Sequence, residues 1–360
     1  MTRLFVGNFS FEQAREAGWN PSRTLARFEA ELACVWLAVM REGDELLCPL
    51  PLDADYLAHM QSLGCPKIRV MTPDQLETSQ ARELVPWGWT PDVRRLAEKL
   101  RIPVNAPDQE TVWQANSRLF SWLLCRELSC VLPTEGFAAS LTELMLLLRS
   151  NAENAGGWVI KPNLGQAGRG QLRGTVPTLT EQQFGAVLHL ISRQGGVAVE
   201  PLLERVAEVG CQWEIKSDGT AELKGVMQLL TDARGAYLGT GTKLVEIAPP
   251  ARENIVQVQA QAVERIAAGG YFGPLGIDAM VYRREGELAV RPIQDINARW
   301  TMGRVGWEWS RRLSMSGRWL HHPEQPEEDA AALSPEWMDG AAVRCRTWWV
   351  RDRESVQAVE

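Results

Sequence analysis

The sequence predicts a protein of the α/β and α+β classes, in which a Rossmann-like lobe with a parallel sheet precedes a larger mixed region. Three observations support this prediction. Short apolar segments alternate with helical apolar spacing through residues 1–112. Three later apolar segments, which read as strands, carry charged residues at or near their ends. The length of 360 residues, with 45% hydrophobic residues, suits two or three lobes rather than one small domain.

The elements of the N-terminal lobe follow from the spacing of its apolar residues. A turn containing Trp87, Trp89 and Pro91 interrupts the pattern. Because strands and helices alternate, we expect a parallel sheet, and such sheets bind ligands at the carboxyl ends of their strands. Asn8–Glu12 has that position, although an ordinary strand-to-helix turn explains it equally well. The predicted strands are Leu4–Gly7, Glu45–Cys48, Lys67–Met71 and Ile102–Asn105, and the predicted helices are Thr24–Met40, Tyr56–Leu63 and Val93–Leu100.

A lysine lies near the end of the next predicted strand, Gly157–Pro162, and a glycine-rich loop follows it. Glycines let backbone N–H groups approach an anion closely, and Lys161 and Arg169 add positive charge. Because the lysine precedes the glycines, the segment is neither the common nucleotide phosphate loop nor the dinucleotide-binding motif. A surface hairpin tip is the alternative for such a loop. Its glycines are Gly165, Gly168 and Gly170.

The segment Gly196–Glu204 predicts an apolar strand that stops at Pro201. Backbone groups freed by the proline would be able to hydrogen-bond a nucleotide base. Leu202 and Leu203 would form an apolar wall for the base, and Glu208 would accept hydrogen bonds from a ribose. Taken alone, the acidic residues Glu200, Glu204 and Glu208 are better explained as a solvated flank.

Two further apolar strands carry residues that indicate metal chemistry. Alternate side chains of a strand share a face, so Asp295, Asn297 and Arg299 would project side by side. Oxygen donors bind Mg²⁺, and a guanidinium binds phosphate. Asp278 lies in the preceding apolar strand, where a carboxylate is costly without a partner, and a shared Mg²⁺ would be that partner. Taken alone, the Asp-x-Asn pattern is also common at strand ends and turns.

In their order, these segments resemble the ATP-grasp superfamily over the region from about Gln114 to Arg304. Members of that superfamily have a lysine strand with a glycine flap, a hinge with a glutamate, an aspartate strand and an acidic-x-Asn strand. The resemblance implies an ATP-grasp fold of two subdomains, with ATP and Mg²⁺ as cofactors. By position it implies metal ligands at Asp278, Asp295 and Asn297, nucleotide contacts from Arg118, Lys161, Gly165, Gly168, Arg169, Gly170, Glu200, Pro201, Leu202, Leu203 and Glu208, and catalytic roles for Lys161, Arg169 and Arg299.

Two positions depart from the superfamily pattern. Arg118 stands where a lysine is more usual, which retains the charge but not the geometry of a point charge. Asp295 stands where a glutamate is usual, and its side chain is one methylene shorter, which reduces its reach toward two metal ions. These departures keep a second interpretation open, an ATP-binding protein of this fold without ligase turnover.

The activity that the resemblance implies is carboxylate activation by a carboxylate-amine ligase. A substrate carboxylate attacks the γ-phosphate of ATP and gives ADP and an acyl phosphate, which an amine or thiol then attacks with release of phosphate. The partners would be small-molecule carboxylate and amine substrates. A kinase that releases a phosphorylated product is a third interpretation.

The resemblance also implies a division into three segments. These are an N-terminal pre-ATP-grasp domain at residues 1–112, an ATP-grasp domain at 113–310 and a C-terminal extension at 311–360. Within the second segment we expect a flap subdomain at about 130–196 and a metal-binding subdomain at about 197–310. After Gly306, we expect a helix that packs through its tryptophans, an exposed linker at His321-His322, and a tail held to the body by Trp348-Trp349.

Composition limits the class of partner. Lys and Arg total 38 against 45 Asp and Glu, a formal net charge of −7, which argues against nucleic acid. The N-terminus lacks the pattern of a signal peptide, and no stretch of about 18 apolar residues occurs. We therefore expect a cytoplasmic protein without membrane contact, for which a homodimer is an open option. The seven cysteines, without a C-x-x-C pair, indicate reduced thiols rather than disulfides or zinc ligands.

Overall fold

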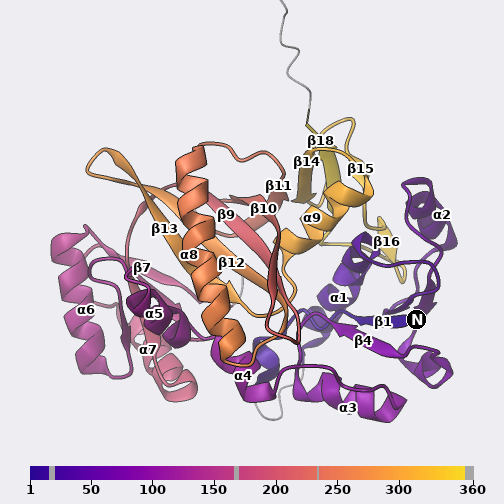
Figure 1. Cartoon of the computed structure of the whole chain (residues 1–360), viewed down its shortest axis with the longest axis horizontal. Coiled ribbons are helices and arrows are strands. Elements are labelled where there is room, and N and C mark those ends of the chain that lie inside the picture. Colours follow the sequence, from indigo (N-terminus) through magenta and orange to yellow (C-terminus); the bar gives the residue numbers. More distant parts are fainter. Residues whose placement is uncertain (16–20, 166–169, 233–234, 353–360) are drawn as a thin grey trace, which may run out of the picture. The chain divides into compact units, whose positions relative to one another are not determined.

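The computed structural model of the chain describes residues 1–15, 21–165, 170–232 and 235–352. The chain forms two compact units, and Figure 1 labels their α-helices and many of their strands. Unit 1 comprises Met1–Asn105, Leu238–Lys243 and Trp300–Glu360, and unit 2 comprises Ala106–Tyr237 and Leu244–Arg299. The functional division at residues 112 and 310 stays a prediction. No helix in the described ranges is both long and apolar enough to span a bilayer.

The N-terminal sheet of unit 1 is parallel, as the alternating pattern predicts. Its strand order is β3-β2-β1-β4. The central strand pairs in parallel on both sides, with Phe5 opposite Leu46 and Val85. Leu4 and Phe5 are fully buried, which explains why this short apolar segment forms the centre of the sheet. The strands are β1 (Arg3–Val6), β2 (Glu45–Leu47), β3 (Arg69–Met71) and β4 (Glu83–Pro86).

The strand predicted at Ile102–Asn105 is wrong. Helix α3 (Pro91–Leu100) is capped by Arg101 in the left-handed conformation, and the chain after it forms no strand. Ile102 instead packs into the core with Leu4 and Val93. The fourth strand of the sheet is β4, which has only two apolar residues, Leu84 and Val85, between a glutamate and a proline that argues against a strand.

The long helix predicted at Thr24–Met40 is also only partly correct. The α-helix α1 spans Arg23–Leu32, and a 3-10 helix, Ala33–Ala38, follows it. All six residues of the 3-10 segment are buried, so the segment has no polar face and its apolar run cannot be distinguished from helical spacing in the sequence. The other helices of this part are α2 (Ala54–Ser62), η1 (Gln13–Arg15) and η3 (Pro73–Thr78).

The C-terminal part of unit 1 contains a helix and antiparallel strands. Trp348 and Trp349 are buried in β18, as predicted, and Trp349 lies opposite Trp319. The linker predicted at His321-His322 is wrong for His321, which belongs to β14 and pairs with Thr347, because the strand continues past the buried Trp319. The elements are α9 (Met302–Arg312), the strands β11 (Tyr237–Gly241), β14 (Gly317–His321), β18 (Thr347–Arg351) and β15 (Ala331–Ala332) in that sheet order, and the hairpin β16 (Trp337–Met338) and β17 (Ala341–Ala342).

Unit 2 contains a small antiparallel sheet with the order β5-β8-β6-β7. Helices α6 (Leu141–Asn154) and α7 (Glu181–Gln194) contribute Leu144, Leu148 and Val187 to its core, where Trp158 and Val199 are also buried. Helix α7 ends at Gly195, whose positive φ of 74° permits the turn into the next strand. The strands are β5 (Gly136–Ala138), β6 (Trp158–Pro162), β7 (Leu172–Gly174) and β8 (Val197–Pro201).

The larger strands of unit 2 have the order β13-β12-β9-β10 and are antiparallel. Helix α8 (Pro249–Ala268) contributes the buried Gln259, which accepts a hydrogen bond from Trp213 and donates to the carbonyl of Pro292. The remaining helices of this unit are α4 (Gln109–Ala115) and α5 (Arg118–Glu127). The strands are β9 (Glu204–Ile215), β10 (Ala221–Thr231), β12 (Gly273–Arg284) and β13 (Glu287–Asn297).

Candidate functional site

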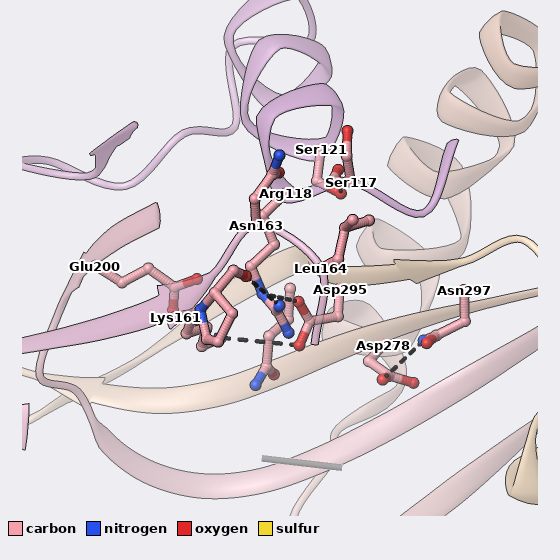
Figure 2. Close-up of polar contacts among 12 residues, drawn as sticks. Ser117, Arg118, Ser121, Lys161, Asn163, Leu164, Glu200, Asp278, Asp295 and Asn297 are labelled. Atoms are coloured by element: carbon pink, nitrogen blue, oxygen red, sulfur yellow. Dashed lines mark hydrogen bonds and ion pairs between the residues drawn. The ribbon is translucent and has the colours of Figure 1, made fainter. Parts of the chain in front are cut away.

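The predicted metal ligands come together on neighbouring strands of unit 2. Asp278 of β12 lies directly opposite Asp295 of β13 in the antiparallel register. The amide nitrogen of Asn297 donates a hydrogen bond to Asp278 Oδ2 at 3.3 Å, the contact drawn in Figure 2. Opposite residues of an antiparallel pair project to the same face. The two carboxylates and the amide therefore lie together on one face of the sheet.

The local sequence explains why Asp278 and Asp295 face each other. Ile277 and Ala279 are fully buried, so their side chains fix the opposite face of β12 in the core. The ladder between β12 and β13 shifts its register between Asp278 and Met280, at a segment that contains Pro292. A bulge of this kind turns side chains without ending the strand. Arg299, beyond the strand end, donates from Nη2 to Asn297 Oδ1 at 3.0 Å.

Two cations lie next to Asp295. Arg118 Nε is 3.0 Å from Asp295 Oδ1, and Lys161 Nζ is 3.8 Å from Asp295 Oδ2. Figure 2 shows Arg118 reaching toward this carboxylate from the first turn of α5. Burial opposes ionisation of Asp295, but the charges of Arg118 and Lys161 outweigh it and lower its pKa below the ordinary 3.8. Asp295 is therefore a carboxylate at neutral pH.

Asn163 helps to bring Arg118 and Lys161 to the same carboxylate. The backbone carbonyl of Asn163, which follows β6, accepts from the N–H of Arg118, and its side-chain oxygen accepts from the N–H of Leu119. Asn163 thereby satisfies donors at the N-terminus of α5. A residue just after the lysine strand thus fixes the helix that carries the arginine.

Asp278 differs from Asp295 in its electrostatic surroundings. Burial, reinforced by the charges of Asp295 and Glu208, raises the pKa of Asp278 to about 7, although Arg299 partly opposes this. An ionised Asp278 lacks sufficient positive charge nearby, and a divalent cation would supply it. The opposite residue on β9 is Gly210, where a Cβ would lie 3.3 Å from Asp278 Oδ1 and 2.8 Å from Gln212 Nε2. The glycine keeps the space beside the carboxylate open.

The donor set fits Mg²⁺, which prefers oxygen ligands. Among the described residues, no group of three or more His, Cys, Asp or Glu side chains is arranged to hold a metal ion. Asp278 and Asp295 provide two carboxylates, so a third protein ligand would be the amide oxygen of Asn297. Such a site, with few protein ligands, suits an ion that is also bound by phosphate oxygens.

Lys161 belongs to a buried network of alternating charges. Its Nζ lies 2.9 Å from Glu200 Oε2, and Arg291 Nη1 donates to the same oxygen at 2.6 Å. Arg291 Nη2 also donates to Glu135 Oε1 at 2.7 Å. Lys161 and Arg291 are each only 3% exposed. Burial opposes ionisation of Glu200, but Arg291 and Lys161 outweigh it and lower its pKa.

Glu208 lies on β9, two positions before Gly210, and its charge acts on Asp278. It forms an ion pair with Arg205 at 2.9 Å and accepts hydrogen bonds from Thr231 and Gln294 at 2.8 and 3.1 Å. Arg205, Glu208 and Thr231 border an open cavity of about 370 Å³ that residues of the paired strands β9 and β10 line. The residue predicted to bind a ribose therefore lines a cavity and has hydrogen-bonding neighbours.

Some of the predicted hinge and flap residues lie in the described part of the chain. Gly165 makes room for Arg118, because a Cβ there would lie 2.8 Å from Arg118 Nη1. Gly170 has a positive φ of 72°. The backbone N–H of Leu202, directly after Pro201, donates to the carbonyl of Gly157, while Leu203 packs against a small core with Leu132 and Met280. Gly168 and Arg169 lie outside the described residues.

Four residues of this arrangement are not predicted by the sequence reasoning. Arg291 is the clearest, because an arginine between Val290 and Pro292 in an apolar strand signals a buried charge with partners. The other three have no comparable local signal: Glu135, Arg205 and Gln294.

Comparisons with known proteins agree with this fold. No protein-family model matches the sequence, and no curated protein matches it. The biotin carboxylase domain of the Hydrogenobacter thermophilus 2-oxoglutarate carboxylase, solved with MgADP and bicarbonate, is similar with a TM-score of 0.59 and 13% identity, over 98% of this chain and 86% of that chain. N5-carboxyaminoimidazole synthetase from Staphylococcus aureus, solved with ADP, is similar with a TM-score of 0.55 and 11% identity, over 98% of this chain and 93% of that chain.

D-alanyl-alanine synthetase A from Vibrio cholerae is similar with a TM-score of 0.50 and 12% identity, over 84% of this chain and 89% of that chain. At such low identity, these likenesses concern the fold alone. They confirm the fold that the sequence resemblance implies: the chain has the ATP-grasp fold.

Proposed function

We propose that this protein is an ATP-dependent ligase that activates a carboxylate as an acyl phosphate for attack by an amine or a thiol, releasing ADP and phosphate. The observation that carries the proposal is the pairing of Asp278 with Asp295 on adjacent strands, with Lys161 and Arg118 beside the second carboxylate. Hard oxygen donors next to two cations suit a metal-bound polyphosphate. The fold supports the proposal, since the three similar enzymes described above are named as carboxylases or synthetases.

Each residue has a role that its position supports. Asp278, Asp295 and Asn297 would hold Mg²⁺, which when bound neutralises negative charge on the transferred phosphoryl group. Lys161 and Arg118 would bind phosphate oxygens, and Arg299 would bind the phosphoryl group or the substrate carboxylate at the end of β13. Glu208 would accept hydrogen bonds from the ribose hydroxyls. The strand end at Pro201 with Leu202 and Leu203 would position the base.

The glycine loop after Lys161 has a proposed role in excluding water. An acyl phosphate hydrolyses readily, so a ligase needs a closed site while the second substrate attacks. We assign this role to the segment from Gly165 to Gly170, with Gly168 and Arg169 as flap residues that contact the nucleotide. The proposed partners are small-molecule carboxylates and amines, in a cytoplasmic protein.

One observation favours a second candidate, an ATP-binding protein without turnover. The ion pair between Arg118 and Asp295, at 3.0 Å, occupies an oxygen that a metal ion would need. In a ligase this pair has to open when Mg·ATP binds. In a binding protein it would stay closed, and the nucleotide would bind with weak dependence on the metal.

Release of ADP and free phosphate distinguishes these functions. The protein would be incubated with Mg·ATP and a panel of carboxylates that includes bicarbonate, with and without amines and thiols. A ligase gives stoichiometric ADP and phosphate only when both a carboxylate and a nucleophile are present. Formation of ADP without any nucleophile would indicate a kinase, and binding of ATP without ADP formation across the panel would support the binding protein.

A further inference from the structure

Arg291 is a buried arginine that the proposed chemistry does not use. It lies on β13, four positions before Asp295 along the chain, and its side chain is 3% exposed. A buried guanidinium is costly unless its donors are satisfied by opposite charges. Arg291 has two such partners, Glu200 on β8 and Glu135 in the turn before β5. It therefore ties β13 to the sheet that carries Lys161.

Glu135 is itself fixed by the backbone of its own turn. Its Oε1 accepts from Arg291, and its Oε2 accepts from the backbone N–H of Leu132 at 3.0 Å. The turn is closed by a hydrogen bond from the N–H of Glu135 to the carbonyl of Leu132. The guanidinium is thereby fixed between two anchored carboxylates, and it has little freedom to rotate.

The other carboxylate that Arg291 contacts, Glu200, also contacts Lys161. Arg291 and Lys161 both contact Glu200 Oε2, at 2.6 and 2.9 Å. A carboxylate oxygen that is shared with a guanidinium holds an ammonium group less tightly than one that serves the ammonium alone. The sharing leaves positive charge on Lys161 available to other anions. Lys161 Nζ lies 3.8 Å from Asp295 Oδ2, so the free charge faces the proposed metal and phosphate site.

We propose that Arg291, anchored by Glu135, is a positioning residue that shares the Glu200 carboxylate and so leaves the Lys161 ammonium available to bind the phosphates of the nucleotide. The inference rests on the proposed function, because it takes Lys161 as a phosphate-binding group. Without Arg291, Glu200 would neutralise Lys161 by itself. The loss would then affect ligands that carry phosphate and spare those that lack it.

The test compares Mg·ADP with adenosine, which lacks the diphosphate and its bound Mg²⁺, by isothermal titration calorimetry. For Arg291→Met we expect the dissociation constant of Mg·ADP to rise about tenfold, the lower range for loss of a group that orients a ligand-binding side chain. Adenosine affinity should change by less than about twofold. Arg291→Lys keeps a charge at the carboxylates and should restore part of the difference.

Arg291→Met leaves Glu135 buried without its partner, which threatens folding. The double variant Glu135→Gln, Arg291→Met removes both charges of that pair and should show the same selective loss of Mg·ADP binding. Arg3→Met is the matched control. It breaks a comparable ion pair with the buried Asp44, at 2.5 Å in unit 1, and should leave both affinities unchanged.

The outcomes separate the two levels of the proposal. If binding of Mg·ADP and binding of adenosine weaken together in Arg291→Met and in the double variant, Arg291 has only a structural role and the inference is wrong. An unchanged Mg·ADP affinity in the double variant overturns it as well. If the parent protein binds Mg·ADP no more tightly than adenosine, the proposed function itself fails, whatever the variants do.

Discussion

Asp278 should destabilise the metal-free protein, so Asp278→Asn should make that protein more stable. The surroundings of Asp278 raise its pKa from the ordinary 3.8 to about 7. At about 1.36 kcal/mol per pKa unit, keeping this group ionised costs at most about 4 kcal/mol. Because the side chain is only half-buried, we expect about 2 kcal/mol. Asparagine keeps the shape and an oxygen acceptor for Asn297 but carries no charge.

The pH dependence has a definite sign. A carboxylate whose pKa is raised by folding contributes most to the free energy of unfolding below about pH 4, and that contribution is lost as the pH rises to about 7. Without Mg²⁺, the free energy of unfolding of Asp278→Asn should therefore exceed that of the parent by about 2 kcal/mol at pH 8 and by less than about 1 kcal/mol at pH 5. Urea unfolding in the presence of EDTA, followed by circular dichroism, measures both differences.

Addition of Mg²⁺ at pH 8 provides the second half of the test. The parent should gain stability, since the ion binds the ionised Asp278 of the folded state, and the asparagine variant should gain less. The same stability difference at pH 5 and pH 8 would refute the electrostatic reasoning. An equal gain from Mg²⁺ in parent and variant would remove Asp278 from the metal site.

Two further predictions concern the neighbouring groups. Lys161→Ala should weaken binding of Mg·ATP in a calorimetric titration, whereas His321→Ala and His322→Ala, in unit 1, should leave it unchanged. Loss of binding in a folded histidine variant would contradict the position assigned to the site. With a substrate pair in hand, Asp295→Asn should reduce turnover at least about hundredfold, the scale of one well-placed electrostatic group, and far more than it reduces ATP affinity. Asp295→Glu should retain part of the activity, and an Asp295→Asn enzyme with parental turnover would exclude the metal-ligand role.

The sequence predicts the strands of the site well because their signal is local. An apolar run with a period of two fixes which residues share a face, and this correctly predicts that Asp278 and Asp295 lie on separate strands of one region. The parallel N-terminal sheet follows from alternation alone. Strand β4 is missed because its two apolar residues lie between a glutamate and a proline, which argues against a strand. The 3-10 segment Ala33–Ala38 is misread as helix because all of its residues are buried.

The charge network could not be predicted in the same way, because its partners are far apart in the chain. Arg291 and Glu200 are 91 positions apart, and Arg291 and Glu135 are 156 apart. Which carboxylate the arginine contacts depends on the register shift in β13 and on the packing of one sheet against another. The sequence shows that a charge is buried, but only the tertiary structure shows which groups neutralise it.

The most direct test of the proposed site is a crystal structure of the protein with Mn²⁺ in place of Mg²⁺ and a non-hydrolysable ATP analogue, in which anomalous scattering locates the metal. We expect a Mn²⁺ peak between the carboxylates of Asp278 and Asp295, with the phosphates next to Lys161 and the Arg118–Asp295 ion pair opened. A nucleotide bound elsewhere, or a metal peak that contacts neither aspartate, would contradict this expectation.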